Sequence, residues 1–436
     1  VVDDNTEMIS MTNIEWKQMY QKRCTTVDQA IRNIESYQKV FLAPMSNEPQ
    51  TLVEELIRQR NRLTDVTLYN VILGSPCKYA NATCYPHFNI RTFLSSPLLK
   101  EAYENQACDY IPVNFSEIPK WIGQEKIDVA LIQLSPPDEA GFCNLGISVD
   151  VVQTLIKEAT IVIAEVNEQL PRTFGDTVVH VEEVDYFVHA ERPLITMENE
   201  LPTAEDLKIG EYVAMLIADY ATIQVGIGKV ANGIIHSLKS KKGLGVHSGS
   251  FSDAMMELMK LGVITNERKE IHRGKTVCTT LTGTKELYEF CHLNDSVELY
   301  PTNFTHNPAI ISNINNFHAI NSALEVSLFG QINAEQIGRH IVGGIGGQMD
   351  FIHGAKLSHG GKSIIALPST AKNGTVSRIK MNVSHVTSIK SEVDYVVTEY
   401  GIAKLFGKSL SERAKSLIAI AHPDFRSALS EELKQI

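Results

Sequence analysis

The stretch Asp128–Val166, DVALIQLSPPDEAGFCNLGISVDVVQTLIKEATIVIAEV, decides the fold class. It opens with an apolar run, Asp128–Leu134, that stops at Ser135-Pro136-Pro137. A helical pattern at Val151–Glu158 then leads into a second apolar run, Ala159–Val166. Strands with so few polar residues are typical of a parallel sheet that is covered by helices on both faces. The stretch therefore predicts an α/β fold, with ligands bound where such strands end.

The same alternation of strands and helices extends towards the N-terminus. Short apolar runs and helical spacings predict two strands and two helices upstream: Val40–Ala43, Thr67–Leu73, Val27–Ser36 and Thr51–Asn61. The first half of the chain is therefore expected to form one open sheet.

A second α/β unit follows a polar, proline-containing stretch. Residues 191–205 hold Pro193, Pro202 and several acidic side chains, and are interpreted as a linker. A helix is expected at Ile209–Tyr220 and a strand at Ala221–Gly226. We expect two similar open, mostly parallel-sheet domains, residues 1–190 and 206–436.

The composition is that of a globular protein. Its 436 residues are 43% hydrophobic and 21% charged, and the formal net charge is −11, which argues against a broad nucleic-acid-binding surface. The seven cysteines have irregular spacing without a CxxC pair, so we expect reduced thiols and no metal site. The acidic Val1–Glu7 lacks the features of a signal peptide, and no apolar run approaches the roughly 20 residues of a membrane helix. A cytoplasmic protein that contacts neither membrane nor nucleic acid is expected.

Two glycine-rich segments are candidates for ligand binding. Thr222–Gly228 (TIQVGIG) runs from a strand through a Gly-x-Gly turn towards a helix, which would bring a helix N-terminus to an anion. An ordinary strand-to-helix turn would have the same sequence pattern. Ala231 stands where a dinucleotide-binding fingerprint has its third glycine, and alanine is tolerated there, so a nicotinamide cofactor is not excluded. Gly343–Asp350 (GGIGGQMD) places four glycines in five residues, which is typical of backbone that passes close to a ligand. No Gly-Lys-Ser/Thr follows, so this segment is not a P-loop.

Other polar residues have weaker claims. His247, Ser248, Ser250 and Asp253 invite a hydrolase-triad interpretation, but triads assemble from distant segments, and a structural role for His247 is favoured. Lys362 and Arg378 could pair with a phosphate or a carboxylate, or could equally be solvated.

Several long blocks together resemble one known family. The blocks are GIGKVANGII (226–235), GVITNERK (262–269), GGIGGQMDF (343–351), GGKSIIALPSTAKNGTVSRI (360–379) and VDYVVTEYGIAKLFGKSLSERAKSLIAIAHPDFR (393–426), with SPPDEAGFCNLG (135–146) and AEVNEQLPRTFGD (164–176) in the first half. The sequence resembles the acetyl-CoA hydrolase/CoA-transferase family over nearly its whole length, and is most similar to its 4-hydroxybutyrate and butyrate CoA-transferases.

The resemblance implies a function. It predicts two CoA-transferase-like domains with the site between them, and the transfer of CoA from an acetyl-, butyryl-, 4-hydroxybutyryl- or dicarboxylyl-CoA to a carboxylate. In this family a glutamate carboxylate attacks the thioester and then carries CoA as a glutamyl thioester, which splits one difficult exchange into easier steps. Coenzyme A is thus a substrate, a small carboxylate is its partner in the exchange, no metal is expected, and the protein is expected to be a homo-oligomer.

Particular residues follow from the resemblance. The family's CoA-binding segment and flexible loop correspond to Gln224, Val225, Gly226, Ile227 and Gly228, and to Gly344, Ile345, Gly346 and Gly347. The family's glutamate corresponds to Gly249, in Leu244–Ser250, which reads LGVHSGS.

A glycine at that position cannot form the family's intermediate. Three alternatives for activity remain open: Glu48 in the Met45–Pro49 loop replaces the carboxylate, the two substrates react directly in a ternary complex, or an activated water hydrolyses the thioester. The protein could also bind acyl-CoA without turning it over. The bulky Met45–Pro49 loop is expected to reshape the acyl pocket.

Overall fold

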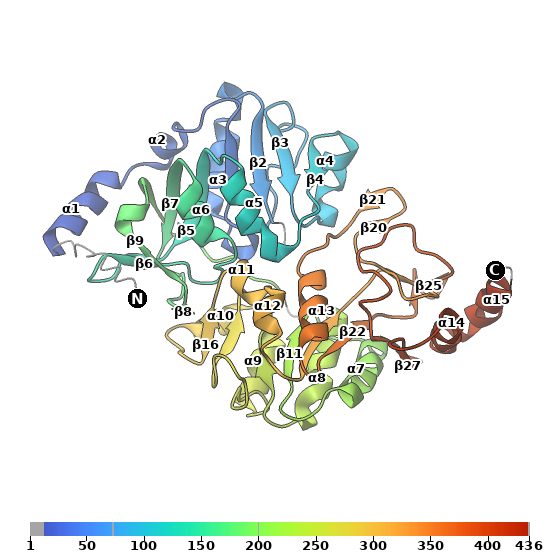
Figure 1. Cartoon of the computed structure of the whole chain (residues 1–436). Coiled ribbons are helices and arrows are strands. Elements are labelled where there is room, and N and C mark those ends of the chain that lie inside the picture. Colours follow the sequence, from blue (N-terminus) through green and yellow to red (C-terminus); the bar gives the residue numbers. More distant parts are fainter. Residues whose placement is uncertain (1–12, 72–73, 199, 435–436) are drawn as a thin grey trace, which may run out of the picture.

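Two open sheets form the framework of the protein (Figure 1). The structure is a computed structural model and describes residues 13–71, 74–198 and 200–434. Sheet 1 has seven strands from the first half of the chain, and sheet 2 has six strands from the second half. The predicted fold class, α/β with two open and mostly parallel sheets, is confirmed.

Sheet 1 is parallel throughout, and its strands lie in the order β10 (Tyr186–Ala190), β7 (Ile161–Asn167), β5 (Val129–Leu134), β1 (Lys39–Leu42), β2 (Val66–Asn70), β3 (Phe88–Thr92) and β4 (Cys108–Tyr110). The chain builds outwards from β1 to β4 and then returns to place β5 on the other side of β1. The order of the strands therefore reverses between β1 and β5. Such a switch point is where open α/β sheets bind ligands.

Sheet 2 repeats this plan, with the order β12 (Gly245–Val246), β11 (Thr222–Val225), β17 (Phe317–Asn321), β22 (Lys362–Ala366), β26 (Tyr395–Thr398) and β27 (Gly401–Lys404). Only β27 runs antiparallel to its neighbour. Its switch point lies between β11 and β17.

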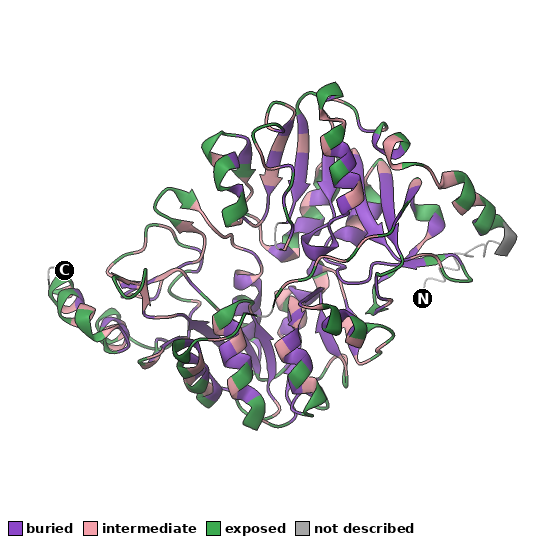
Figure 2. Ribbon diagram, turned by 180° about the vertical axis from the view of Figure 1, so that it is seen from behind, coloured by how far each residue is buried: buried purple, intermediate pink, exposed green. Residues whose placement is uncertain are grey.

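The strands are buried on both faces, as the apolar runs predict (Figure 2). In β5, Ala130 and Ile132 face α5 (Ile118–Gln124) and α6 (Val152–Glu158), whereas Leu131 faces the opposite layer. That opposite layer contains α2 (Val27–Ile31) and α3 (Gln50–Arg58). Sheet 2 lies between α7 (Ala204–Leu216) with α8 (Lys229–Ser237) and α12 (Pro308–Ile311) with α13 (Gln348–Leu357).

The remaining elements are short or peripheral. The other helices are α1 (Asn13–Arg23), α4 (Lys100–Glu104), α9 (Asp253–Lys260), α10 (Lys285–Cys291), α11 (Thr302–Thr305), α14 (Leu410–Ala419) and α15 (Pro423–Leu433), with 3-10 turns at Met45–Asn47, Arg60–Arg62, Pro97–Leu99, Phe115–Glu117, Val181–Glu183 and Leu238–Ser240. The other strands are β6 (Phe142–Asn144), β8 (Phe174–Gly175), β9 (Val178–His180), β13 (Ser250–Ser252), β14 (Thr276–Cys278), β15 (Thr280–Thr282), β16 (Val297–Leu299), β18 (Glu325–Ser327), β19 (Ile332–Asn333), β20 (Gln336–Ile337), β21 (His340–Ile341), β23 (Thr370–Ala371), β24 (Val376–Ser377) and β25 (Ile379–Lys380).

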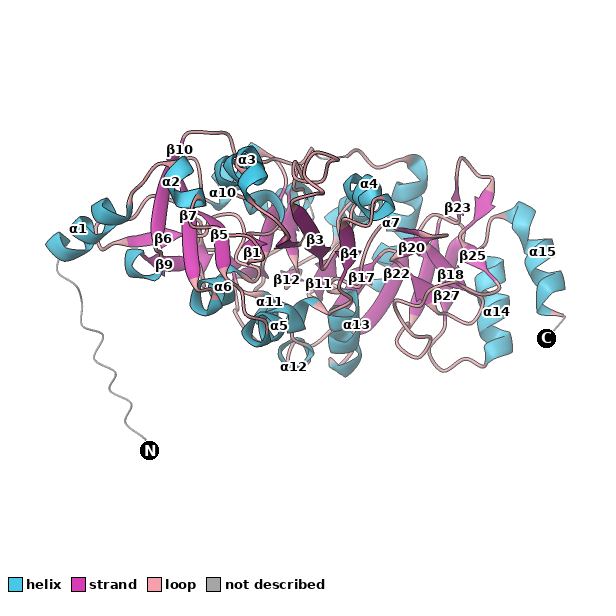
Figure 3. Ribbon diagram, turned by 90° about the horizontal axis from the view of Figure 1, so that it is seen from above, coloured by secondary structure: helices cyan, strands magenta, loops and turns pink. Residues whose placement is uncertain are grey.

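The two halves of the chain are interlocked rather than merely tethered. Strand β8 from the first half pairs with β16 from the second. The amides of Val149 and Leu281 donate across the junction to the carbonyls of Thr279 and Ile147, at 3.0 and 2.8 Å. Helices α1 and α15 lie at opposite ends of the molecule (Figure 3). The two sheets are therefore held in a fixed relation.

Several predicted boundaries are corrected. The helix expected over Val27–Ser36 ends at Ile31, because the side-chain amide of Asn33 donates to the carbonyls of Gln29 and Ala30 and closes the last turn. Helix α7 begins at Ala204, so residues 204 and 205 of the expected linker are helical. Thr203 and Asp206 form a capping box that fixes this start. Residues 72 and 73 of the expected Thr67–Leu73 strand lie outside the described residues.

The cysteines and the helices bear on two further expectations. All seven cysteines are free thiols, and all except the half-buried Cys24 are buried. Among the described residues, no helix is long and apolar enough to cross a membrane.

Candidate active site

The two switch points open onto one pocket. Met45 follows β1 in sheet 1, whereas Gln224 and Asn321 stand at the ends of β11 and β17 in sheet 2. The side-chain amides of Gln224 and Asn321 face each other, with nitrogen-to-oxygen distances of 3.4 and 3.2 Å. Each sheet thus contributes to the pocket from the edge where open α/β sheets bind ligands.

The pocket has a volume of about 260 Å³. Its lining consists of Met45, Leu94, Phe115, Gln224, Val225, Gly226, Ile227, Gly249, Ser250, Thr279, Thr280, His306, Asn321, Ile345, Gly346, Gly347, Gln348 and Phe351. None of these side chains is a carboxylate, a lysine or an arginine. The pocket therefore offers hydroxyls, amides, backbone groups and one imidazole to a ligand.

Most of the predicted site residues meet in this pocket. Eight of the eleven line it: Gln224, Val225, Gly226, Ile227, Gly249, Ile345, Gly346 and Gly347. Gly228 lines an adjoining hollow of about 110 Å³ that shares Gly226 and Ile227 with the pocket. Gly344 lies just outside the lining, packed close to the carbonyl oxygen of Phe93.

The glycine loop 343–347 is bound to the first half of the chain. The amides of Ser95 and Phe115 donate to the carbonyls of Gly343 and Gly346, at 3.2 and 3.1 Å. The amide of Ile345 donates to the hydroxyl of Tyr110 at 2.8 Å, and that hydroxyl lies 3.1 Å from Oε1 of Glu335. The loop therefore forms one wall of the pocket and is held in place by contacts with the opposite half of the molecule.

Glu48 lies away from the pocket lining. Its carboxylate accepts hydrogen bonds from Nε2 of Gln50, at 2.7 Å, from the hydroxyl of Ser75, and from the hydroxyl of Tyr79 at 3.4 Å. Burial raises the pKa of Glu48 to about 6, although these donors oppose the shift. Its contacts thus hold the carboxylate within the first half of the chain.

The triad considered for residues 247–253 is not assembled. Nε2 of His247 lies 2.8 Å from the carbonyl oxygen of Thr305, and Ser250 donates to Oγ1 of Thr282 at 2.6 Å. Asp253 accepts from the amide and hydroxyl of Thr284. Because each side chain has a different partner, the segment cannot act as a serine hydrolase.

Lys362 and Arg378 are also used structurally. Nζ of Lys362 donates to the carbonyl of Leu216 at 2.5 Å. The guanidinium of Arg378 donates to the carbonyls of Thr370 and Ala323, at 3.1 and 3.2 Å. Neither residue lines the pocket, and both side chains donate to backbone carbonyls of the protein itself.

His306 lines the pocket, although no sequence pattern selects it. It follows α11 and is 3% exposed. Burial lowers the pKa of His306 to about 3, so the ring is neutral. The only local sequence signal is an isolated histidine in Thr305-His306-Asn307-Pro308, which contains nothing that connects it with Gly249.

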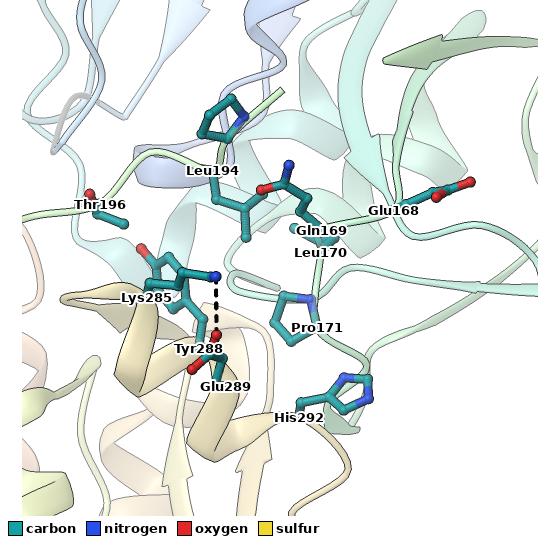
Figure 4. A pocket seen from close by; sticks show the side chains of 11 residues that line it. Glu168, Gln169, Leu170, Pro171, Leu194, Thr196, Lys285, Tyr288, Glu289 and His292 are labelled. Carbon is teal, nitrogen blue, oxygen red and sulfur yellow. Dashed lines mark ion pairs between the residues drawn. The ribbon is translucent and has the colours of Figure 1, made fainter. Parts of the chain in front are cut away.

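A larger cavity of about 570 Å³ lies at another junction of the two halves (Figure 4). It is lined from the first half by Leu170, Pro171 and Leu194, among others, and from α10 by Tyr288. Lys285 and Glu289, both on α10, form an ion pair across 3.2 Å at its edge. This cavity contains neither glycine segment and neither switch point.

The fold and the pocket define a class: an α/β protein whose two open sheets face one pocket with their switch points. Matches to two protein-family models identify the family of the chain. Residues 8–198 match the acetyl-CoA hydrolase/transferase N-terminal domain, and residues 283–433 match the C-terminal domain of the same family. The chain belongs to the acetyl-CoA hydrolase/transferase family.

Named relatives span the whole chain. The 4-hydroxybutyrate coenzyme A transferase of Clostridium kluyveri is 41% identical, over 97% of this chain and 100% of its own. The succinyl-CoA:cyclohexane-1-carboxylate CoA transferase of Geobacter metallireducens is 37% identical, over 96% of this chain and 97% of its own.

Solved structures agree with this placement. The 4-hydroxybutyrate CoA-transferase of Porphyromonas gingivalis superimposes with a TM-score of 0.84 at 33% identity, covering 96% of this chain and 99% of that one. RipA from Yersinia pestis superimposes with a TM-score of 0.91 at 31% identity, again over 96% and 99% of the two chains.

Proposed function

We propose that this protein is an acyl-CoA:carboxylate CoA-transferase that works without a glutamyl-CoA intermediate at residue 249. One observation carries the proposal: in a chain of this family, the switch points of both sheets line a single pocket that also contains the glycine loop. A transferase must keep its activated acyl group from water, and a site recessed between two sheets helps to do so.

The two ends of the pocket suit the two parts of an acyl-CoA. Met45, Leu94 and Phe115 form an apolar wall from the first half of the chain that suits a short acyl group. At the other side, Gly226–Gly228 lead from the pocket to the adjoining hollow and to the N-terminus of α8. The positive end of a helix dipole favours an anionic group, and we assign the CoA moiety to this side, with its charged groups at the helix end rather than beside the hollow's carboxylates, which are Glu198, Glu200 and Asp253.

Gly249 is proposed to stand where the family has its glutamate. Two observations support this assignment. Gly249 lines the pocket, and its carbonyl accepts hydrogen bonds from the amides of Thr279 and Thr280, at 3.0 and 3.1 Å. No carboxylate among the described residues takes its place in the lining. The chemistry must then use another group, or the direct reaction of the two substrates.

The relatives suggest a range of substrates. Their names include 4-hydroxybutyrate, cyclohexane-1-carboxylate and butyryl-CoA with acetate. We propose a short-chain acyl-CoA as donor and a small carboxylate as acceptor. Because Met45 contributes to the apolar wall, its size is expected to limit the acyl chain.

A matrix of donors and acceptors tests the function. Acetyl-, butyryl- and succinyl-CoA are each incubated with acetate, butyrate, 4-hydroxybutyrate or succinate, and new thioesters are measured by mass spectrometry. A transferase forms a new thioester only when an acceptor is present. Continuous release of free CoA over many turnovers without any acceptor would indicate a hydrolase, and binding without turnover would indicate a non-catalytic relative.

Chemical trapping tests the missing glutamate separately. Borohydride and hydroxylamine modify a glutamyl-CoA thioester, so the peptide that spans residues 247–253 is examined after treatment with acyl-CoA. We expect no label, because Gly249 has no carboxylate.

Light scattering of the intact protein tests the expected homo-oligomer.

A further inference from the structure

The imidazole of His306 lines the pocket and is held between two aromatic rings. Its ring lies between Phe351, with ring centroids 4.5 Å apart, and Phe115, at 5.7 Å. Phe115 belongs to the first half of the chain and Phe351 to α13, so the ring is held by both halves. A ring in such a clamp has little rotational freedom, which places its nitrogens accurately.

Gly249 and Gly347 make room for this ring. A Cβ atom added to Gly249 would lie 2.9 Å from Nε2 and 3.2 Å from Cε1 of His306. A Cβ added to Gly347 would overlap Cδ2, and would lie 2.7 Å from Nε2. The imidazole edge that carries Nε2 therefore occupies the space into which a side chain at residue 249 would project.

The hydrogen bonds of the other ring nitrogen fix the tautomer. Nδ1 of His306 lies 2.8 Å from Oγ1 of Thr305, and that hydroxyl lies 3.3 Å from the carbonyl oxygen of Pro301. Both contacts are hydrogen bonds only if Nδ1 carries the proton and the hydroxyl donates to Pro301. We assign the proton accordingly, which leaves Nε2 with its lone pair.

Nε2 is the free end of this network. Within the described part of the chain no hydrogen bond reaches it, although His306 is almost fully buried. Burial keeps the ring neutral, so the lone pair stays available at neutral pH. A ring of such low basicity suits a general base poorly, because efficient proton transfer needs a pKa near the working pH. A neutral imidazole whose free lone pair lies beside Gly249 in the pocket lining can instead act as a nucleophile towards a thioester.

We propose that His306 is the catalytic nucleophile of this site and carries the acyl group on Nε2 during CoA transfer, which rests on the proposed transferase function. The lone pair of Nε2 attacks the thioester carbonyl carbon, the carbon–sulfur bond breaks, and CoA leaves as thiolate. The proton on Nδ1 stays on the ring, so the acyl-imidazolium is a cation beside the anionic thiolate.

The remaining steps return the enzyme to its starting state. An oxygen of the acceptor carboxylate attacks the acyl carbon, and the carbon–nitrogen bond breaks with its electron pair returning to Nε2. The product is a mixed anhydride. The CoA thiolate then attacks the acceptor's carbonyl carbon, which gives the new thioester and releases the donor's carboxylate. No proton is gained or lost overall.

The first experiment uses the intact, unmodified protein. It is mixed with acetyl-CoA labelled in the acetyl group, without an acceptor, and followed by rapid-quench intact-protein mass spectrometry, by peptide mapping and by thiol titration of free CoA. We expect a burst of about one CoA per subunit and an acetyl group on the peptide that contains His306. Label on the Glu48 peptide instead, or no burst and no label, would overturn the proposal.

Variants provide a second, independent readout. His306→Asn keeps an amide donor for Thr305 but has no nucleophilic nitrogen, and transfer is expected to fall at least ~100-fold. His318→Asn is the matched control, because His318 is a buried histidine outside the pocket. His306→Ala leaves a space beside Gly249, and added imidazole is expected to restore part of the transfer to it.

The outcomes separate the two proposals. Transfer that is undiminished in His306→Asn would overturn the role of His306 and leave the transferase standing. Acetyl label on His306 without transfer to any acceptor would overturn the transferase and leave the nucleophile standing. A melting temperature of His306→Asn similar to that of His318→Asn separates loss of chemistry from loss of fold.

Discussion

The hydroxyl of Ser116 lies 2.6 Å from Oδ1 of Asp350, and the amide of Ser116 lies 3.0 Å from Oδ2 of the same carboxyl. Ser116 belongs to the first half of the chain, whereas Asp350 is in the first turn of α13, directly after the glycine loop. The pair therefore holds the loop and the helix against the opposite half of the molecule.

Replacing Ser116 with Ala removes the shorter of these two contacts. We expect a loss of stability of about 1–3 kcal/mol, because a buried carboxyl loses a partner, together with a lower kcat/KM. Chemical denaturation and steady-state transfer kinetics measure the two effects. Ser411→Ala, at an exposed position on α14, is the control. Identical kinetics in both variants would show that the contact does not support the site.

Gly346 adopts a backbone conformation that disfavours a side chain. Its φ is +55°, and a Cβ there would touch only Leu94, at 3.8 Å. Gly346→Val should therefore cost about 1–2 kcal/mol in backbone strain. Because the loop lines the pocket, we expect turnover to fall by at least ~10-fold, more than the stability loss explains.

Gly374 supplies the matched control for this substitution. Its φ is +84°, nothing lies near a Cβ there, and it is exposed and outside the pocket lining. Gly374→Val should show a similar change in melting temperature with full turnover. If both variants lose activity in proportion to their stability, the loop has no special role in catalysis.

Restoring a carboxylate at residue 249 requires a second change. In Gly249→Glu the new side chain meets His306 at its first carbon, so we expect a destabilised protein with little transfer. In Gly249→Glu combined with His306→Asn the obstruction is smaller, and a glutamyl-CoA thioester should form from acetyl-CoA. Hydroxylamine trapping of the peptide that spans residues 247–253 measures it. Efficient labelling in the single variant would show that His306 moves aside easily.

The buried carboxyl of Asp150 should make the stability of the folded protein depend on pH. Among the described residues no group donates to its carboxyl oxygens, and burial raises its pKa from 3.8 to about 7. The folded protein therefore binds this proton more tightly than the unfolded chain does. The contribution to stability is complete below pH 3.8 and is lost as the pH rises through about 7.

Asp150→Asn should remove the part of the stability loss at high pH that comes from ionisation of the Asp150 carboxyl. Asparagine tolerates the φ of +41° at this position, and its amide does not ionise. The variant should unfold at a higher temperature than the unmodified protein at pH 8, and the difference should shrink towards pH 5. Burial also raises the pKa of Asp350 to about 7 and that of Glu48 to about 6, so part of the slope should remain. Parallel curves for the two proteins would contradict the assignment.

The sequence predicted the sheets better than it predicted the site. Apolar runs such as Asp128–Leu134 identify buried strands, because burial on both faces leaves no room for polar residues. Helix ends depend on single side chains, and the closing role of Asn33 after α2 is not visible in a periodicity. The glycine segments were found because their backbone requirements are local. His306 was missed because its position beside Gly249 arises only when two distant segments are folded together.

The way the pocket is built also affects how damage to this protein will appear. Met45 and Phe115 come from one half of the chain, and Gln224 and His306 from the other. A substitution that removes a polar contact on the seam, such as that between Tyr110 and the amide of Ile345, would leave the buried hydrophobic clusters in place, yet would pull the walls of the pocket apart. Such a variant would have a normal circular dichroism spectrum and a normal expression yield, although it would be inactive. Screens that score solubility alone will pass such variants, and only an assay of turnover will detect them.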